Sequence, residues 1–189
     1  MIRPLKLISR LTAKEGRYSR VKQTTQFVVG ASDERDKELV TYAGGLYNKL
    51  GLQRVYFSAY QRGAGKPDLP GEHSPLSNRE LLTREHRLYQ VDWLLRKYGF
   101  AAGEIPMNRE GNLSLEIDPK EAWAQQHPEF FPVHINRASK RDLLRVPGLG
   151  PVMVGRIIKY RRDGYNIRKI KDLGRSSKLL LKAEKYIIF

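Results

Sequence analysis

The sequence contains no cysteine. Disulfides, thiolate zinc sites, cysteine nucleophiles and an iron–sulfur cluster held by this chain alone are therefore excluded. Long apolar runs are also lacking, because no segment approaches the roughly 20 apolar residues of a membrane-spanning helix. The first residues have charges spread through them, unlike a signal peptide. These absences predict a cytoplasmic protein with no membrane partner.

Acidic residues become scarce toward the end of the sequence. The chain of 189 residues has 35 basic and 20 acidic residues, a net charge of +15. Residues 131–189 hold 15 basic and 4 acidic residues, whereas residues 61–130 hold 9 and 11. A basic excess favours polyanionic partners, and its position places the expected polyanion site in the last third of the chain.

Two short runs of β-branched and aromatic residues, 25–30 and 54–60, predict buried strands. Between them, Ser32 is expected to cap a helix that ends near Leu50. This order predicts a parallel strand–helix–strand unit. After a loop rich in glycine and proline, a second helix is expected from Asn78 to Tyr98, and residues 84–92 are interpreted as its solvated face.

The segment from 134 to 162 has the pattern of two short helices joined by a tight turn. Ser139 is expected to cap the first helix, and Pro151 suits the first position of the second. Free amides of the turn, together with the dipole of the second helix, make an anion site that suits a phosphate. Nearby basic side chains would add attraction. The predicted nucleic-acid-binding residues are Arg145, Gly148, Leu149, Gly150, Val152, Arg156 and Lys159.

Two other interpretations of this turn stay open. It could be a structural turn between helices that pack in a core, or a hairpin that binds another protein. Backbone contacts to phosphates carry no base information, so binding to nucleic acid would be insensitive to sequence. DNA is the expected partner, and the pattern itself does not distinguish DNA from RNA. No catalytic residue and no metal ligand is assigned, because the four histidines show no metal-ligand spacing.

The turn Pro147–Gly150 resembles the loop of the helix-hairpin-helix motif, typically Pro-Gly-(Ile/Leu/Val)-Gly, and the lead-in 135–139 resembles it too. Val152 and Met153 depart from it, since such modules often have small polar or basic residues there. Residues 167–186 look like a degenerate second hairpin, in which Asp172-Leu173-Gly174-Arg175 replaces the glycine-rich loop. This half is expected to complete the fold rather than to bind phosphate.

A wider resemblance extends from about Lys22 to Phe189. In these residues the chain resembles the C-terminal half of a group of radical S-adenosylmethionine proteins of DNA modification or repair. Four blocks and the hairpin carry it: QTTQFVVGASDERD (23–36), RVYFSAYQR (54–62), REHRLYQVDWLLRKYGF (84–100) and DPKEAWAQQHPEFFPVHINRA (118–138). The resemblance implies a partial (β/α) barrel and a uracil-DNA-glycosylase-like partner.

The cysteine loop of that family, CxxxCxxC, is missing here. The chain is therefore not a self-sufficient radical enzyme. It would use S-adenosylmethionine and a 4Fe-4S cluster only if another, N-terminal radical chain supplied the cysteines, as in a split enzyme. The resemblance would place Val28, Gly30 and Glu34 near the adenosine. The simpler interpretation, which we favour, is that Gly30 turns the chain and Glu34 faces the helix dipole.

The expected fold class is α/β plus all-α. A partial (β/α) barrel remnant spans residues 1–100, a linker with a short helix from Pro119 to about Gln126 spans 101–133, and a helix-hairpin-helix domain spans 134–189. The expected activity is non-sequence-specific DNA binding. The two alternatives are a subunit of a split radical enzyme and a protein-interaction module.

Overall fold

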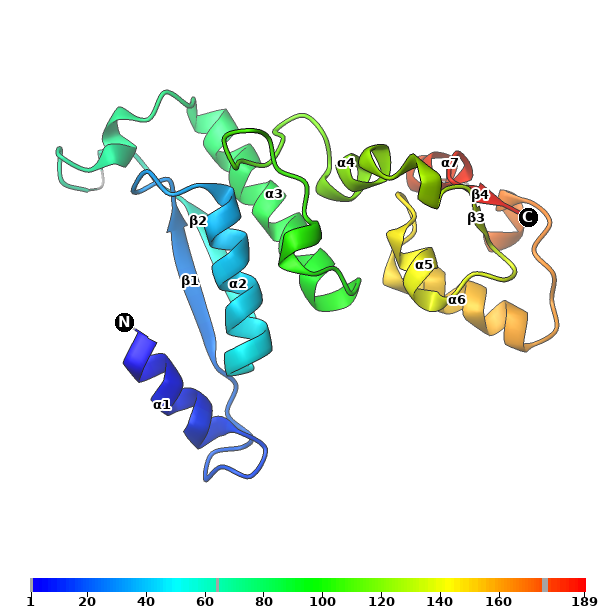
Figure 1. The fold of residues 1–189 in the computed structure, drawn as a ribbon, viewed down its shortest axis with the longest axis horizontal. Coiled ribbons are helices and arrows are strands. Elements are labelled where there is room, and N and C mark those ends of the chain that lie inside the picture. The colour runs from blue at the N-terminus through cyan, green and yellow to red at the C-terminus, as the bar shows by residue number, and fades with distance from the viewer. Residues whose placement is uncertain (1, 64, 175–176) are drawn as a thin grey trace.

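The computed structural model describes residues 2–63, 65–174 and 177–189. It is a mixed, mainly helical structure with two small sheets. Figure 1 shows an elongated molecule in which a strand-containing unit and a helical unit lie at opposite ends of the long axis. Within the described ranges, no helix has both the length and the apolar character needed to cross a bilayer.

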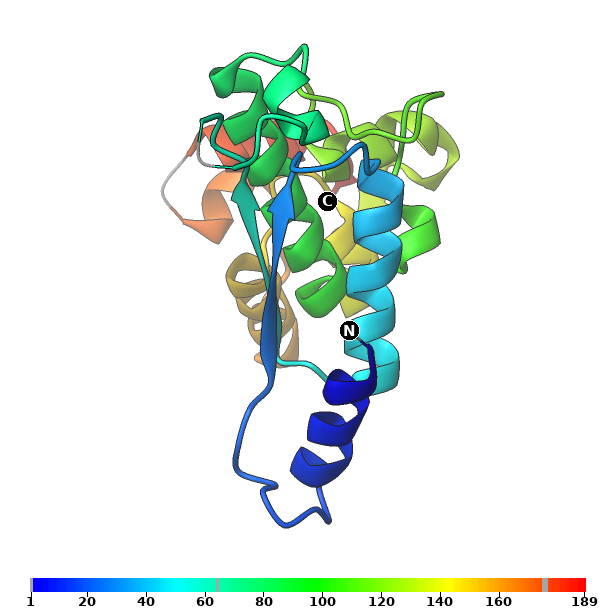
Figure 2. The ribbon, with the colours of Figure 1, turned by 90° about the vertical axis from the view of Figure 1, so that its left-hand side faces the viewer.

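The first unit contains a two-stranded parallel sheet. Strand β1 (Thr24–Val29) pairs with β2 (Arg54–Ala59), with Thr24 opposite Arg54. Helix α2 (Asp36–Leu50) connects the strands, and α3 (Asn78–Lys97) follows β2. Both helices lie on the same side of the sheet (Figures 1 and 2). The prediction of a parallel strand–helix–strand unit is therefore confirmed.

The opposite face of this sheet is uncovered by any helix or strand among the described residues (Figure 2). Val28 and Tyr56 point outward there, with 52% and 41% of their surface exposed. Neither strand has a second neighbour in the part of the chain that the structure describes. A parallel sheet ordinarily has both faces covered, so this small sheet is an exception.

The first core extends beyond residue 100. It combines side chains of β1, β2, α2 and α3 with Ile105, Leu113 and Trp123 from the segment predicted as a linker. Helix α4 (Pro119–Gln126) carries Trp123 and begins at the side chain of Asp118, which accepts hydrogen bonds from the amides of Lys120 and Glu121. The predicted linker therefore contributes apolar side chains to the first core.

The second unit is built from α5 (Lys140–Arg145), α6 (Pro151–Arg162) and α7 (Lys178–Glu184), with a 3-10 helix at Ile170–Leu173. Strand β3 (Val133–His134) pairs in parallel with β4 (Ile187–Ile188), which joins the two ends of the unit. The expected second hairpin thus consists of the 3-10 helix and α7. Arg175 of its loop lies outside the described residues.

Two element boundaries differ from the sequence predictions. Helix α2 begins at Asp36 and not after Ser32, because the Ser32 hydroxyl donates to the Glu34 carboxylate at 2.6 Å and closes a turn instead. Helix α1 (Ile2–Thr12) lies in the first residues, for which the sequence predicts no element. Ser9 Oγ of this helix donates to the Leu50 carbonyl at the end of α2.

Aromatic rings and the ion pairs Arg145–Glu104 and Lys182–Glu121 connect the two units. Tyr98, Phe130 and Phe131 pack against both cores. The Arg145 guanidinium, from α5, donates to Glu104 at 2.7 Å and lies over the rings of Phe100 and Trp123, at 4.3 and 4.7 Å from their centroids. Because this cation is almost fully buried, separating the units would leave it without its partners.

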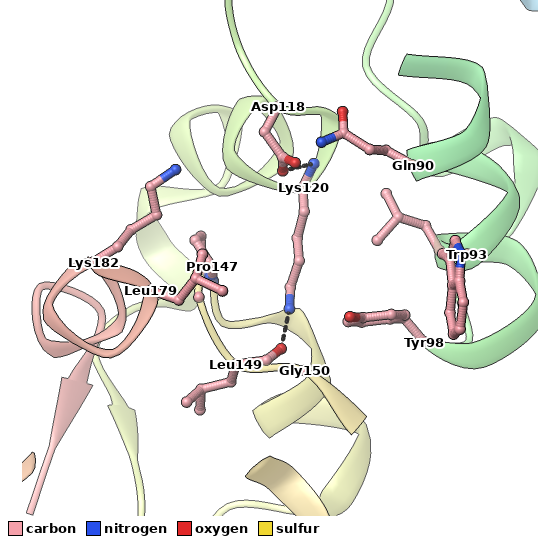
Figure 3. Close-up of a pocket in the computed structure, with 12 residues that line it drawn as sticks. Gln90, Trp93, Tyr98, Asp118, Lys120, Pro147, Leu149, Gly150, Leu179 and Lys182 are labelled. Carbon is pink, nitrogen blue, oxygen red and sulfur yellow. Dashed lines mark hydrogen bonds between the residues drawn. The ribbon is translucent and has the colours of Figure 1, made fainter. Parts of the chain in front are cut away.

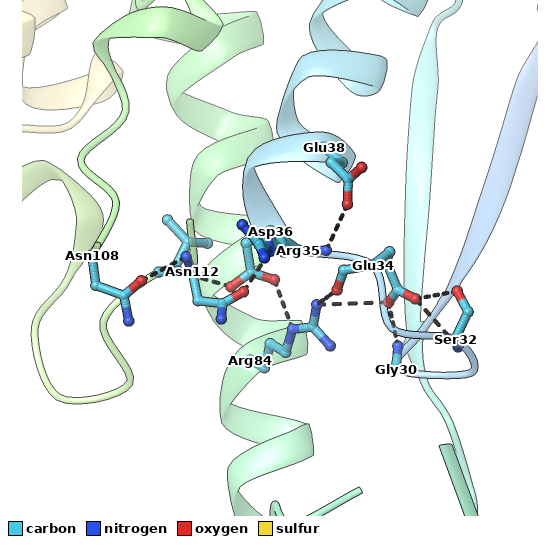
Figure 4. A network of polar contacts seen from close by, with 10 residues as sticks. Gly30, Ser32, Glu34, Arg35, Asp36, Glu38, Arg84, Asn108 and Asn112 are labelled. Carbon is cyan, nitrogen blue, oxygen red and sulfur yellow. Dashed lines mark hydrogen bonds and ion pairs between the residues drawn. The ribbon is translucent and has the colours of Figure 1, made fainter. Parts of the chain in front are cut away.

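The polar stretch 84–92 of α3 is not a solvated face as predicted. Arg84 is buried, and its Nε donates to the Asp36 carboxylate at 2.7 Å (Figure 4). Asp92 is also buried, and it accepts from Arg96, which lies one helical turn further along α3. The misprediction arises because Arg84 and Asp92 have partners on α2 that a local charge pattern does not reveal. Arg84 pairs with Asp36, and Asp92 accepts from the Tyr47 hydroxyl.

Arg84 should therefore be essential for stability. Arg84→Met leaves the Asp36 carboxylate, only 1% exposed, without its cation. Breaking a buried pair from one side typically costs about 3–5 kcal/mol. We expect a loss of this size in the free energy of unfolding measured by urea denaturation. Arg79→Met, at an exposed position of the same helix, is the control and should change it by less than about 0.5 kcal/mol.

Candidate nucleic-acid interface

The hairpin is defined by short-range contacts. The Ser139 hydroxyl accepts from the Asp142 amide at 3.1 Å and caps α5. After α5, the Leu149 amide donates to the Val146 carbonyl at 3.1 Å and closes the turn. Leu149 is buried in the second core, so its side chain anchors the turn. Pro151 then occupies the first position of α6, where its missing N–H leaves no carbonyl unpaired.

Gly148 holds this turn against α7. Its φ of +86° favours glycine, and a Cβ built on it would stand 2.1 Å from the Leu179 carbonyl oxygen. Gly150 differs, since its backbone is extended and a Cβ would meet only the Tyr98 hydroxyl, at an ordinary 3.5 Å. Gly148 therefore serves the packing of the hairpin, whereas Gly150 leaves the approach to the loop open.

Backbone donors gather at the start of α6. Within the described residues, the amides of Gly148, Gly150 and Val152 have no hydrogen-bond partner. Val152 is 82% exposed, so the first turn of α6 is open to solvent. Unpaired amides at the positive end of a 12-residue helix form a site for an anion.

The predicted basic residues are divided by the structure. Arg156 and Lys159 lie on the exposed face of α6, one turn apart, and Arg156 also donates to the Leu173 carbonyl at 2.8 Å. Arg145 is not on this surface, because its guanidinium is buried between the units. Only Arg156 and Lys159 of the predicted cations can meet a phosphate from solvent.

A pocket of about 270 Å³ opens beside the hairpin (Figure 3). Pro147, Gly148 and Gly150 form one wall, and Trp93 and Tyr98 belong to the opposite wall on the α3 side. Lys182 of α7 contributes a cation, which pairs with Glu121 at 2.5 Å. The pocket therefore combines backbone donors, aromatic rings and basic side chains.

Lys120 crosses this pocket from α4. Its Nζ donates to the Leu149 carbonyl at 2.6 Å and lies 4.5 Å from the centre of the Tyr98 ring (Figure 3). Burial lowers the pKa of Lys120 to about 7, although the negative charge of Asp118 opposes the shift. The ammonium therefore titrates near neutral pH directly beneath the hairpin loop.

The residues that the family resemblance would place at adenosine form a closed turn. Glu34 accepts from the Gly30 amide at 2.6 Å and from Ser32, and it faces Arg84 at 3.6 Å (Figure 4). Gly30 and Glu34 also line a cleft of about 830 Å³ beyond the carboxyl end of β1, whereas Val28 is 52% exposed on the outward side of the alternating strand β1. These contacts give Glu34 a structural role.

The side chains present do not fit an iron–sulfur cluster, because the chain has no thiolate. In the described ranges, no group of three or more histidine, aspartate or glutamate side chains is placed to hold a metal ion. The nucleic-acid-binding assignments of individual residues remain predictions.

The hairpin geometry and a comparison with known families agree on this part of the chain. Residues 130–183 match the helix-hairpin-helix motif. The match covers α5, α6 and the 3-10 helix and reaches into α7. No curated protein and no solved structure matches the chain. The comparisons give no support to the wider resemblance to radical S-adenosylmethionine proteins.

Sequence reasoning missed Trp93, Tyr98, Lys120 and Lys182 as neighbours of the hairpin. One signal was present: Trp93 falls outside the apolar stripe of α3, so a large aromatic ring stands on the polar side of a helix. Lys120 gave no signal, since its partner Leu149 is 29 positions away in the sequence.

Lys120 makes the stability of the fold depend on pH. Its folded-state pKa, about 7, lies below the ordinary 10.5, so the unfolded chain binds the proton more tightly. Through this group, the free energy of unfolding rises as pH increases from about 7 to about 10.5 and is lowest below pH 7.

Lys120→Met removes this titration and leaves the buried position apolar. We expect the Tm of the variant, relative to the wild type, to be several degrees higher at about pH 6 than at about pH 10, since about 1 kcal/mol shifts Tm by roughly 2–4 °C. Lys97→Met, at an exposed position of α3, should show no such trend. A Tm difference for Lys120→Met that does not change with pH would contradict the assignment.

Proposed function

We propose that residues 134–189 bind DNA through its sugar-phosphate backbone, without reading the base sequence. The observation that carries the proposal is the set of amides at Gly148, Gly150 and Val152 that have no partner among the described residues, within a segment that matches the helix-hairpin-helix motif. A phosphate oxygen can accept from these amides while the helix dipole stabilises its charge.

The charge around the hairpin supports the same function. Residues 131–189 carry a net charge of +11. Arg156 and Lys159 lie on the exposed face of the helix whose amides would hold the phosphate. Contacts of this kind position a nucleic acid and are common to all sequences, so affinity should vary with salt far more than with base composition.

Gly150→Ala tests the anion site without disturbing the packing. The added methyl group meets only the Tyr98 hydroxyl at 3.5 Å, but it narrows the approach to the loop amides. We expect roughly a tenfold loss of affinity for a duplex oligonucleotide, since one hydrogen bond to a charged group is worth about 1.5–3 kcal/mol. Fluorescence anisotropy at several salt concentrations is the measurement.

The controls use glycines elsewhere in the chain. Gly45→Ala adds a methyl group with no atom within 4 Å, on α2, and should leave the affinity unchanged. Gly148→Ala should destabilise the fold itself, because of its contact with Leu179. Wild-type affinity that does not fall with salt would overturn the proposal, and so would Gly150→Ala binding with full affinity. Capture of a protein partner that survives high salt would favour the interaction-module alternative.

A second candidate function concerns the first unit. We propose that residues 22–100 belong to a partial (β/α) barrel that a separate, cysteine-bearing chain completes. The uncovered face and the free edges of the β1–β2 sheet support this candidate, and so does the cleft beyond the end of β1. A cluster and S-adenosylmethionine would then depend on the other chain.

The test is isolation of the full-length chain from its native cells under anaerobic conditions. A brown complex that contains iron and binds S-adenosylmethionine is the expected result. Val28→Lys is the matched variant: it places a charge on an exposed position of the sheet face and should lose the iron while it keeps the fold. A colourless protein that does not bind S-adenosylmethionine would reject this candidate and leave DNA binding untouched.

A further inference from the structure

The pocket beside the hairpin has walls of two chemical kinds. On the hairpin side are backbone atoms of Gly148 and Gly150, with the cations of Lys120 and Lys182 nearby. On the α3 side are the rings of Trp93 and Tyr98, which both line the pocket (Figure 3). An anionic group fits the first wall and a flat ring fits the second. Both walls belong to the same pocket of about 270 Å³.

Trp93 is the accessible aromatic ring of this pocket. Its side chain is 46% exposed, whereas the other tryptophan, Trp123, is 4% exposed in the first core. The Arg96 guanidinium lies 5.6 Å from the Trp93 ring centre and is itself held by Asp92, so it orients the indole. A large ring held at the edge of a basic pocket can stack on a nucleobase of any kind.

Polar groups complete the pocket between the two walls. Gln90 and Asp118 line it beside Trp93 and Lys120 (Figure 3). The Asp118 carboxylate caps α4, and the side-chain amide oxygen of Gln90 accepts from the Arg87 guanidinium at 2.9 Å, so both side chains are fixed in place. They offer hydrogen-bonding groups to the edge of a ring that enters the pocket.

We propose that this pocket receives the base of an unpaired nucleotide, stacked on Trp93, while a neighbouring phosphate lies on the hairpin amides. The proposal rests on the proposed DNA binding and deepens it, because it names the preferred substrate class. A base inside a continuous duplex is stacked on both faces and cannot enter, whereas a base in a single strand, a gap or a frayed end can. The protein then binds single-stranded DNA more tightly than blunt duplex of equal length.

The charges of the pocket fit a nucleotide better than an apolar ligand. Lys120 uses one of its donors on the Leu149 carbonyl, and the remaining N–H groups of its ammonium have no hydrogen-bond partner among the described residues. Lys182 adds a second, half-buried ammonium, which is paired with Glu121 and can also donate to a group in the pocket. A nucleotide carries a flat base and an anionic phosphate in one molecule. The base suits the aromatic wall of the pocket and the phosphate suits the hairpin wall.

Intrinsic fluorescence gives a direct test, since the chain has 2 tryptophans and only Trp93 is exposed. Titration with a short oligothymidylate should quench the emission of the wild-type protein, and a blunt duplex should quench it much less. Trp93→Phe should abolish the quenching and keep most of the affinity, because a phenyl ring still stacks. The remaining emission, from buried Trp123, serves as an internal reference.

Trp93→Ala should weaken binding of the oligothymidylate by about tenfold or more, within the roughly 5- to 150-fold range expected for one stacked base. Binding of the duplex should not change. Tyr42→Ala, which removes an exposed ring on α2, is the control and should affect neither ligand.

The outcomes separate this inference from the function on which it rests. Equal affinity of the wild type for both ligands, or of Trp93→Ala and the wild type for the single strand, would overturn the base pocket and leave backbone binding intact. Absence of salt-sensitive binding to either ligand would instead overturn the proposed function itself.

Discussion

The close approach of Gly148 to the carbonyl oxygen of Leu179 fixes the geometry of the hairpin. It seats the turn on α7 and places Leu149 in the second core. The backbone conformation alone therefore orients the amides at the start of α6 toward solvent. Donors that are already oriented need little rearrangement when a ligand binds, so the affinity of such a site depends on packing beneath it.

Local signals in the sequence were sufficient for the hairpin. Ser139 as a cap and Pro151 at a helix start each act within a few residues, and the structure has both in the expected roles, with Gly148 at a positive φ in the predicted turn between them. The parallel strands and α4 were found for the same reason. In contrast, the start of α2 was missed because the Glu34 carboxylate competes for Ser32.

The surroundings of the site could not be read from the sequence, because they depend on contacts between distant residues. Arg145 resembles any other cation near a phosphate-binding turn, yet Glu104 and two aromatic rings enclose it. Lys120 lies in a helix with no evident relation to the hairpin. Three buried cations, Arg84, Arg145 and Lys120, connect elements that are far apart in the chain. A charge pattern predicts a solvated side chain in each case, because it carries no information on whether the side chain is buried.

The enclosure of Arg145 also has a geometric consequence. The rings of Phe100 and Trp123 in the first unit pack against the Arg145 guanidinium of the second unit. Rotation of one unit against the other would therefore separate this buried charge from its neighbours. A polynucleotide bound to α6 would therefore keep a constant orientation relative to the uncovered face of the β1–β2 sheet. A protein bound to that face of the sheet would therefore lie at a fixed distance from the bound strand and in a fixed orientation to it.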